Sequence, residues 1–171
     1  GDYICVSGQI GDAAFGLNHR DHPLKKRLDY PTPRCALGQS LKDLANSMID
    51  VSDGLAQDLG HILKASNVGA QVELNQLPID TALKELTQEQ QWKYALAGGD
   101  DYELCFTISP ENHTKLLQQQ LDINISTIGQ ITENKELCFV QNGKTKISSD
   151  ICNDSINLIN IKNVTGMIKI N

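Results

Sequence analysis

Stretches in which apolar residues alternate at every second position are repeatedly followed by stretches with a helical period, and this restricts the chain to an α/β fold. The clearest junction is MIDV at residues 48–51, followed by SDGLAQDLGHILKAS at 52–66. The first stretch is typical of a short strand. The second predicts a helix, capped by Ser52 or Asp53, whose buried face is formed by Leu55, Leu59, Ile62 and Leu63.

The same patterns predict the remaining elements. Further strands are expected in DYICVSG (2–8), AQVELN (70–75), YELCFTIS (102–109), STIGQIT (126–132) and ELCFVQNGKTKIS (136–148). Helices are expected after the glycine-spaced turn GQIGDAAFGL (8–17), in CALGQSLKDLAN (35–46), within 79–96 and in PENHTKLLQQQL (110–121). Asn142-Gly143 indicates a hairpin turn. The predicted fold class is α/β (α+β): one mixed β-sheet covered by helices.

Composition excludes several classes of protein. The chain has 171 residues, 40% of them hydrophobic, which predicts one globular domain. Its net charge is −6 and its main basic run, HRDHPLKKR (19–27), is interpreted as a solvated loop, so we expect no nucleic-acid partner. No apolar segment reaches the roughly 20 residues that cross a bilayer, and we expect a cytoplasmic protein without a membrane partner. The five cysteines lack a C-x-x-C pair and are predicted to be reduced, mostly buried thiols.

The domain prediction has two parts. Residues 1–149 carry the strand and helix patterns, whereas residues 150–171 are rich in Asn and Ile and show no clear helical period. We interpret the second part as an atypical tail, either an added strand pair or a poorly ordered segment.

Oxygen-bearing side chains gather at the junction between the predicted strand and helix. Asp50 and Ser52 share a face of the strand, and Asp53 follows where the helix begins. Ligands of α/β sheets tend to bind outside the carboxyl ends of strands, and Mg²⁺ prefers one or two carboxylates completed by phosphate oxygens. The alternative is structural: Ser52 or Asp53 would cap the helix, and Asp58 would lie on its solvated face. Asp50 favours a metal site, because a carboxylate buried in an apolar strand needs a partner.

The stretch AGGDDYELCFTIS places two acids directly after a glycine turn. The simplest interpretation is a turn followed by the exposed start of a strand, with Glu103 facing water. On this interpretation alone, neither Asp100 nor Asp101 has an assigned role.

Taken together, IDVSDGLAQDLGHI and ALAGGDDYELCFT, preceded by GDYICVSGQIGDAAFGL and followed by IGQIT and CFV, carry a family resemblance. In motif order and spacing, the chain from Gly1 to about Val140 resembles the C-terminal half of the thiamine-monophosphate kinase family. That family belongs with the aminoimidazole ribonucleotide synthetase and selenophosphate synthetase proteins. The resemblance implies the fold of the C-terminal domain of this superfamily.

The resemblance also implies an activity and its residues. The family transfers the γ-phosphoryl group of ATP to thiamine monophosphate with several Mg²⁺ ions, without a covalent catalytic residue, and is expected to form homodimers. Carried over by motif, Asp50 and Asp53 are Mg²⁺ ligands, Ser52 contacts ATP, and Asp100 contacts thiamine monophosphate. The cofactor expected from the resemblance is Mg²⁺, with ATP as co-substrate.

Three departures from the family pattern qualify this expectation. Family members carry an N-terminal domain with an Mg²⁺ and ATP motif, and Gly1 matches a point after it, so we expect this chain alone to be inactive. Asp100 stands where relatives often have Glu. Phe139 is the last aromatic residue, whereas relatives end in an aromatic residue that contacts the substrate.

Two alternatives follow. The chain could be a noncatalytic, truncated or split domain that binds ligand weakly. It could also be the C-terminal half of a related ATP-dependent synthetase, although GGDDYEL favours the thiamine enzyme.

Overall fold

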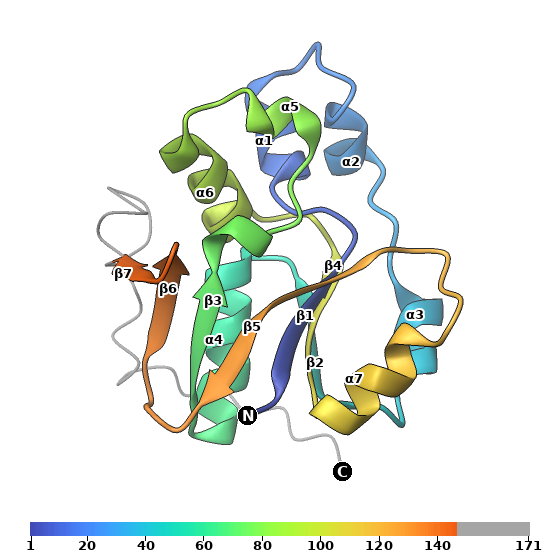
Figure 1. Ribbon diagram of the computed structural model, residues 1–171. Helices are drawn as coiled ribbons and strands as arrows, with labels where there is room; N and C mark the ends of the chain where they lie inside the picture. Colours follow the sequence, from blue (N-terminus) through green and yellow to red (C-terminus); the bar gives the residue numbers. More distant parts are fainter. Residues whose placement is uncertain (147–171) are drawn as a thin grey trace.

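The sheet is mixed, as the sequence patterns predict. The computed structural model describes residues 1–146, and in this part seven strands form one sheet in the order β2-β4-β1-β5-β3-β6-β7 (Figure 1). Neighbouring strands are antiparallel except β3 and β6, which are parallel. The strands are β1 (Tyr3–Ser7), β2 (Ala45–Val51), β3 (Gly69–Glu73), β4 (Glu103–Ile108), β5 (Ile125–Thr132), β6 (Leu137–Gln141) and β7 (Lys144–Lys146).

Helices occupy the connections between successive strands from β1 to β5. They are α1 (Asp12–Asn18), α2 (Lys25–Asp29), α3 (Cys35–Leu41), α4 (Leu55–Ser66), α5 (Thr81–Lys84), α6 (Gln88–Ala97) and α7 (Pro110–Leu117), with a 3₁₀ turn, η1 (Leu74–Gln76). None of the helices in residues 1–146 combines the length and apolar character that a membrane crossing requires.

One face of the sheet packs against α4, which lies behind the sheet in Figure 1. The predicted helical face is confirmed, because Leu55, Leu59, Ile62 and Leu63 are all buried. Leu55, Leu59 and Leu63 join a core that includes apolar side chains of β1, β2, β3 and β6 together with Trp92 and Leu96 of α6. The 3.6-residue period of this segment therefore reports a real one-sided contact with the sheet.

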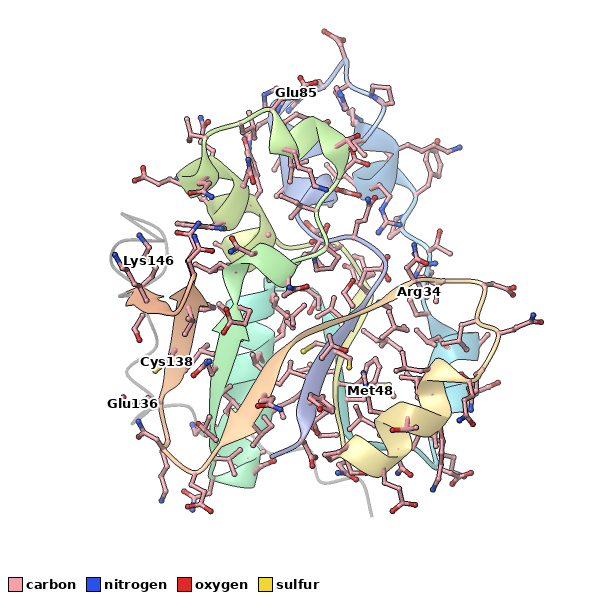
Figure 2. The ribbon with its side chains drawn as sticks, viewed as in Figure 1. Arg34, Met48, Glu85, Glu136, Cys138 and Lys146 are labelled. Atoms are coloured by element: carbon pink, nitrogen blue, oxygen red, sulfur yellow. The ribbon has the colours of Figure 1, made fainter. Side chains whose placement is uncertain are left out.

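The other face packs against α3 and α7 near strands β1, β2 and β4. Cys5, Leu37, Leu41, Phe106, Ile108 and Leu116 form this second cluster. Met48 of β2 packs against it and is labelled beside α7 in Figure 2. Strand β4 contributes to both clusters because successive side chains point to opposite faces, with Cys105 on one side and Phe106 on the other. Both faces of this part of the sheet are therefore covered.

The predicted helix over 35–46 is wrong in its second half. Helix α3 ends at Leu41, and Ala45 begins β2, where it pairs with Ile108 of β4. Leu44 lies in the intervening turn, with its N–H donating to the carbonyl of Leu41. Pairing along β4 overrides the helical spacing, although Leu44 and Ala45 still pack against the second cluster.

The predictions for the end of the chain divide at residue 146. Asn142 and Gly143 connect β6 to β7 with φ angles of 51° and 74°, the left-handed values that a type I′ hairpin turn requires. The Asn-Gly hairpin is therefore confirmed. The predicted tail, residues 150–171, lies outside the described residues.

The cysteine prediction is confirmed in part for the described residues. Cys5, Cys35, Cys105 and Cys138 are all free. Cys5 and Cys105 are buried, whereas Cys35 is exposed and Cys138 half-buried, so these thiols are not mostly buried. Burial raises the pKa of the Cys5 thiol to about 11, which keeps it protonated at neutral pH.

The contact between α4 and the sheet generates a stability prediction. Leu59→Ala should lower the free energy of unfolding by about 2–5 kcal/mol, because it removes a fully buried side chain and leaves a cavity. Leu117→Ala is the matched control, since that side chain is 71% exposed, and it should change stability by less than about 0.5 kcal/mol. Urea denaturation followed by circular dichroism measures both values. Equal losses in the two variants would contradict the assignment of the core.

Candidate functional site

The candidate site lies at the edge of the sheet where β1 and β2 end and β4 begins. Val51, the last residue of β2, pairs with Glu103, the first residue of β4, and Val6 of β1 pairs with Cys105. Because β1 and β2 both run antiparallel to β4, their carboxyl ends meet at its start. This edge, called here the polar edge, brings together residues 7–13, 50–53 and 98–103.

Two backbone hydrogen bonds join the predicted site segments at the polar edge. The N–H of Asp100 donates to the carbonyl of Ser52 at 2.9 Å, and the N–H of Tyr102 donates to the carbonyl of Val51 at 2.9 Å. Asp100 and Ser52, which are 48 positions apart in the sequence, are therefore neighbours. The structure thus brings together the two motifs on which the site prediction was based.

Close approach of these segments depends on glycine. A Cβ atom on Gly99 would lie 2.5 Å from the carbonyl oxygen of Ser52, which is too close for any other residue without a shift of the backbone. Asp100 and Tyr102 adopt φ angles of 66° and 51°. Left-handed backbone is less costly for Asp than for a bulky aromatic residue, so Tyr102 is held in a strained conformation.

The predicted metal, nucleotide and substrate residues are accessible. Asp50, Asp53 and Asp100 are exposed and Ser52 is half-buried. Since Asp50 is exposed, the expectation that it needs a partner to offset burial is wrong, and any metal role rests on its position. The side chain of Gln57 donates to Asp53 at 3.1 Å, and the Tyr102 hydroxyl donates to Asp100 at 3.5 Å.

Asp58 is buried, so its predicted place on a solvated helix face is wrong. Its Oδ2 accepts hydrogen bonds from the N–H groups of Ser52 and Asp53, both at 3.0 Å. Burial raises the pKa of Asp58, and the two N–H donors act against that rise. Asp58 therefore anchors the loop on which Ser52 and Asp53 lie.

Neither Ser52 nor Asp53 caps α4. The N-cap is Gly54, whose φ is 111° and whose added Cβ would meet backbone atoms of Leu96 and Ala97 at 3.1 Å. The capping prediction is wrong because packing against α6 requires glycine at this position. Ser52 and Asp53 are thereby left without a capping role.

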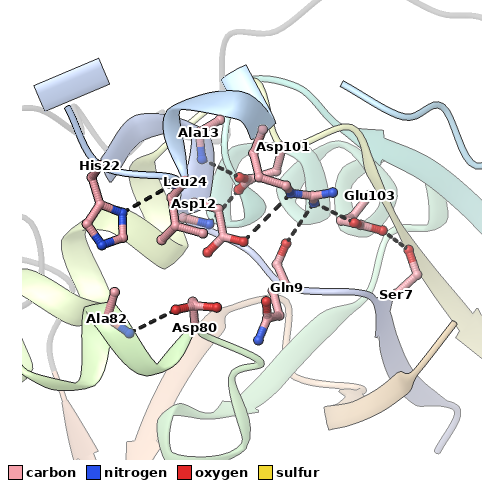
Figure 3. A network of polar contacts seen from close by, with 12 residues as sticks. Ser7, Gln9, Asp12, Ala13, His22, Leu24, Asp80, Ala82, Asp101 and Glu103 are labelled. Atoms are coloured by element: carbon pink, nitrogen blue, oxygen red, sulfur yellow. Dashed lines mark hydrogen bonds and ion pairs between the residues drawn. The ribbon is translucent and has the colours of Figure 1, made fainter. Parts of the chain in front are cut away.

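Asp101, the second acid of GGDD, has a structural role that the sequence analysis missed. It is buried and accepts hydrogen bonds from the N–H groups of Gly11 at 2.6 Å and Ala13 at 3.2 Å (Figure 3). Burial raises the pKa of Asp101 to about 6, although both N–H groups act against the rise. Asp101 therefore fixes the start of α1 beside the polar edge.

Glu103 is fully buried, so the expectation that it faces water is wrong. Its carboxylate accepts hydrogen bonds from Ser7 at 2.6 Å, from Arg27 at 2.7 Å, and from Arg34 at 2.6 and 2.8 Å. Burial alone would raise the pKa of Glu103, but the hydrogen bonds from Arg34, Ser7 and Arg27 outweigh it and hold this pKa below its ordinary value.

The basic run HRDHPLKKR is only partly the solvated loop that was predicted. Residues 25–29 form α2, and Arg27 points inward to Glu103. Arg34, at the end of the YPTPR linker, donates to both oxygens of the same carboxylate and is labelled above α3 in Figure 2. Nothing in the local sequence pattern pairs residue 27 or 34 with residue 103, which is why the network could not be predicted.

Asp12 also belongs to the polar network, but its hydrogen bonding is incomplete. Its Oδ2 lies 3.7 Å from Nε of Arg27, and its buried Oδ1 has no hydrogen-bond partner in the described residues (Figure 3). Burial, followed by the nearby charge of Asp101, raises the pKa of Asp12 to about 7, and Arg27 lowers it only partly. Asp12 therefore exchanges its proton near neutral pH.

The accessible carboxylates suit a hard cation but do not complete its coordination. Asp50 and Asp53 offer the oxygen ligands that Mg²⁺ prefers. In residues 1–146, no three His, Cys, Asp or Glu side chains come close enough to hold a metal ion together. The donor set therefore fits Mg²⁺ only where phosphate oxygens, water or another segment supplies the other ligands.

This fold and site define the class of protein. Residues 6–140 match the family described as AIR synthase related protein, C-terminal domain, and the chain belongs to that family. The chain is similar to thiamine-monophosphate kinases: that of Escherichia coli (strain K12) is 45% identical over 84% of this chain and 49% of the relative. The expected superfamily is thereby confirmed.

Solved structures agree with this assignment. The crystal structure of thiamine-monophosphate kinase from Stenotrophomonas maltophilia K279a is 40% identical with a TM-score of 0.76, covering 85% of this chain and 51% of that one. A structure of AaThiL complexed with AMPPCP and TMP is 29% identical with a TM-score of 0.71, covering 86% of this chain and 49% of that one. The chain thus spans about half the length of the relatives that it matches.

The buried carboxyl of Asp12 generates a prediction of pH dependence. Its pKa is about 7 in the fold and about 4 in the unfolded chain. Between these values the folded state holds a proton that the unfolded state has lost, so the free energy of unfolding should fall as pH rises from about 4 to 7. Asp12→Asn should weaken this decline and stabilise the protein above pH 7; Asp101 adds a similar but smaller contribution.

Urea denaturation at pH 5 and pH 8 measures this effect. The gain from Asp12→Asn should be larger at pH 8, while Asp43→Asn, an exposed carboxylate before β2, should show no such difference. A larger gain at pH 5 would mean that Asp12 is ionised and stabilising in the fold.

Proposed function

We propose that the chain forms the C-terminal half of a thiamine-monophosphate kinase, which transfers the γ-phosphoryl group of ATP to thiamine monophosphate and releases thiamine diphosphate and ADP. The observation that carries this proposal is the 45% identity to the Escherichia coli relative over 84% of the chain. Because the chain spans about half of that relative, the proposal includes an N-terminal half that supplies the rest of the site. The proposal further includes a homodimer and a cytoplasmic location.

Each residue of the proposed site has a role suited to its position. Asp50 and Asp53 would hold Mg²⁺, Ser52 would contact ATP, and Asp100 would contact thiamine monophosphate. Three observations support this arrangement: the carboxylates are exposed, the Asp100 N–H donates to the Ser52 carbonyl, and Asp58 anchors the loop that carries Ser52 and Asp53. The substrate pair matches that bound in the AaThiL structure, which contains AMPPCP and TMP.

The proposed reaction is a direct transfer that needs positioning and charge neutralisation rather than a covalent nucleophile. Mg²⁺, when bound, offsets the charge of the transferring oxygens. The contribution of this chain is to orient both substrates: Ser52 can donate a hydrogen bond to a nucleotide phosphate, while Asp100 can accept one from an N–H or O–H group of the other substrate. The close packing of Gly99 against Ser52 would keep the Ser52 and Asp100 side chains at a fixed relative position.

A pair of carboxylate substitutions tests the metal role. In a chimaera of this chain with the N-terminal half of the Escherichia coli relative, Asp50→Asn and Asp53→Asn should each lower thiamine diphosphate formation by about a hundredfold or more. Stability should stay unchanged or rise, because removing an exposed charge from a crowded site relieves repulsion. Asp43→Asn, at the opposite end of β2, is the control and should retain full activity. Full activity of both site variants would reject the assignment.

The chain by itself should show no appreciable kinase activity. Positioning of reactants contributes on the order of 7–11 kcal/mol to such reactions, and half a site cannot hold two phosphate groups in line. A coupled assay of ADP formation, with calorimetry using Mg-ATP, checks this expectation. Turnover by the isolated chain would show that the N-terminal half is dispensable, whereas ligand binding without turnover in the chimaera would favour a noncatalytic binding domain.

A further inference from the structure

Two arginines from different segments converge on one carboxylate oxygen at the polar edge. Arg27 reaches Oε1 of Glu103 at 2.7 Å and Arg34 reaches the same oxygen at 2.6 Å. Arg34 also donates from Nε to Oε2 at 2.8 Å, and Ser7 donates to Oε2 at 2.6 Å. Each oxygen of Glu103 thus has two donors, and the carboxylate has little capacity for further partners.

The arginines, in contrast, keep N–H donors that Glu103 does not use. A guanidinium group has five N–H donors. Arg27 donates from one nitrogen to both Glu103 and the carbonyl of Gln9, and Arg34 donates from two nitrogens to Glu103. Two positive charges share one Glu103 carboxylate, and Asp12 offsets Arg27 only weakly across 3.7 Å. The charge of Asp101 also acts on Arg27, whereas Arg34 has Glu103 as its ion-pair partner in the described residues.

Both arginine side chains are partly exposed, although Nε of Arg27 is buried and has no hydrogen-bond partner in the described residues. Glu103 is 0% exposed, whereas the side chains of Arg27 and Arg34 are 26% and 20% exposed. The anion lies inside and the cations extend outward from it. Such an arrangement holds two guanidinium groups in place while part of each arginine side chain stays accessible.

The position of the arginines relates them to the proposed site. Glu103 pairs with Val51, which lies between Asp50 and Ser52 in β2 and the following turn. Glu103 also follows Asp100 by three residues in the GGDDYEL segment. Arg27 and Arg34 therefore meet at the start of β4, beside the end of β2 that carries the exposed Asp50.

We propose that Arg27 and Arg34 form a phosphate-binding site and that Glu103 is the positioning residue that holds them together. The proposal deepens the proposed kinase function and rests on it, since it assigns to these arginines the phosphoryl oxygens of one of the two substrates. Guanidinium groups bind phosphate through paired N–H donors, which supplies orientation as well as charge. They would also offset the repulsion between a phosphate and the neighbouring carboxylates in a chain of net charge −6.

The competing explanation is that the three residues only brace the fold. The two explanations predict different results for Glu103→Gln. In a purely structural contact, loss of either partner has the same effect, whereas in a phosphate site only the arginines contact the ligand. If the residues only brace, neutralising Glu103 or an arginine damages the same contact and should weaken ligand binding alike. If the arginines bind phosphate, Glu103→Gln retains acceptor oxygen for them and raises the local positive charge, so phosphate affinity should be kept or increased.

The test measures binding of pyrophosphate, thiamine monophosphate and AMPPCP to the full 171-residue chain by calorimetry, each with and without Mg²⁺. The variants are Arg27→Gln, Arg34→Gln and Glu103→Gln, with Arg20→Gln, an exposed residue between α1 and α2, as the matched control. An arginine variant leaves Glu103 buried with fewer partners and can unfold. The double variant Arg34→Gln/Glu103→Gln therefore accompanies it, because it removes the buried charge as well.

Pyrophosphate affinity should fall at least about tenfold in Arg27→Gln, in Arg34→Gln and in the double variant. It should be retained or rise in Glu103→Gln and be unchanged in Arg20→Gln. If the arginine variants lose affinity for thiamine monophosphate in the same way, the arginines bind the acceptor phosphate. If they lose affinity for AMPPCP instead, the arginines bind the nucleotide. Equal losses in Glu103→Gln and the arginine variants, unchanged affinity in the arginine variants, or no pyrophosphate binding would each overturn the proposal.

The outcome also separates this proposal from the kinase function. Arginine-dependent binding of pyrophosphate, with no better binding of thiamine monophosphate or AMPPCP, would support the phosphate site and argue against the proposed substrates. Retained turnover of Arg27→Gln and Arg34→Gln in the chimaera, with loss in Asp50→Asn, would support the kinase and overturn the arginine site.

Discussion

The polar edge depends on the hydrogen bonds and ion pairs of the buried Glu103 carboxylate. Glu103 begins β4, and its donors come from the end of β1, from α2 and from the linker before α3. A carboxylate in this position would be strongly destabilising without partners, and four hydrogen bonds to a fully buried group offset that cost. The surface segment 19–34, which contains prolines and charged residues, is thereby attached to the start of β4.

Acidic residues at this edge divide into two groups with different physical roles. Asp58, Asp101 and Glu103 are buried and accept hydrogen bonds, and each fixes a segment of backbone or a pair of side chains. Asp53 and Asp100 are exposed, and each lies in a segment that a buried acid stabilises. The buried group thus provides the rigid support that exposed, mutually repelling carboxylates need to keep a defined geometry.

Backbone conformation contributes to the same support. Gly99 lies against the carbonyl of Ser52, Gly54 packs against α6, and Asp100 and Tyr102 adopt left-handed conformations. Strain of this kind persists only where surrounding contacts determine it, and here the contacts are the hydrogen bonds from residues 100 and 102 to β2 and its turn. Folding energy from the sheet and the two apolar clusters is therefore used to hold the loops of the site in place.

Most local elements and the family could be predicted from the sequence alone. The helical period of residues 55–63 correctly predicted the buried face of α4, and Asn142-Gly143 correctly predicted the hairpin. The order of the motifs correctly predicted the superfamily. These signals could be used because they depend on neighbouring residues or on motif spacing. Tertiary structure alone decided which acids are buried: Asp58 and Glu103 were expected in solvent, and Asp50 was expected to need a partner. An acidic residue looks the same in the sequence whether it is buried or exposed. The environment of Glu103 is set by strand pairing and by arginines 69 and 76 positions away.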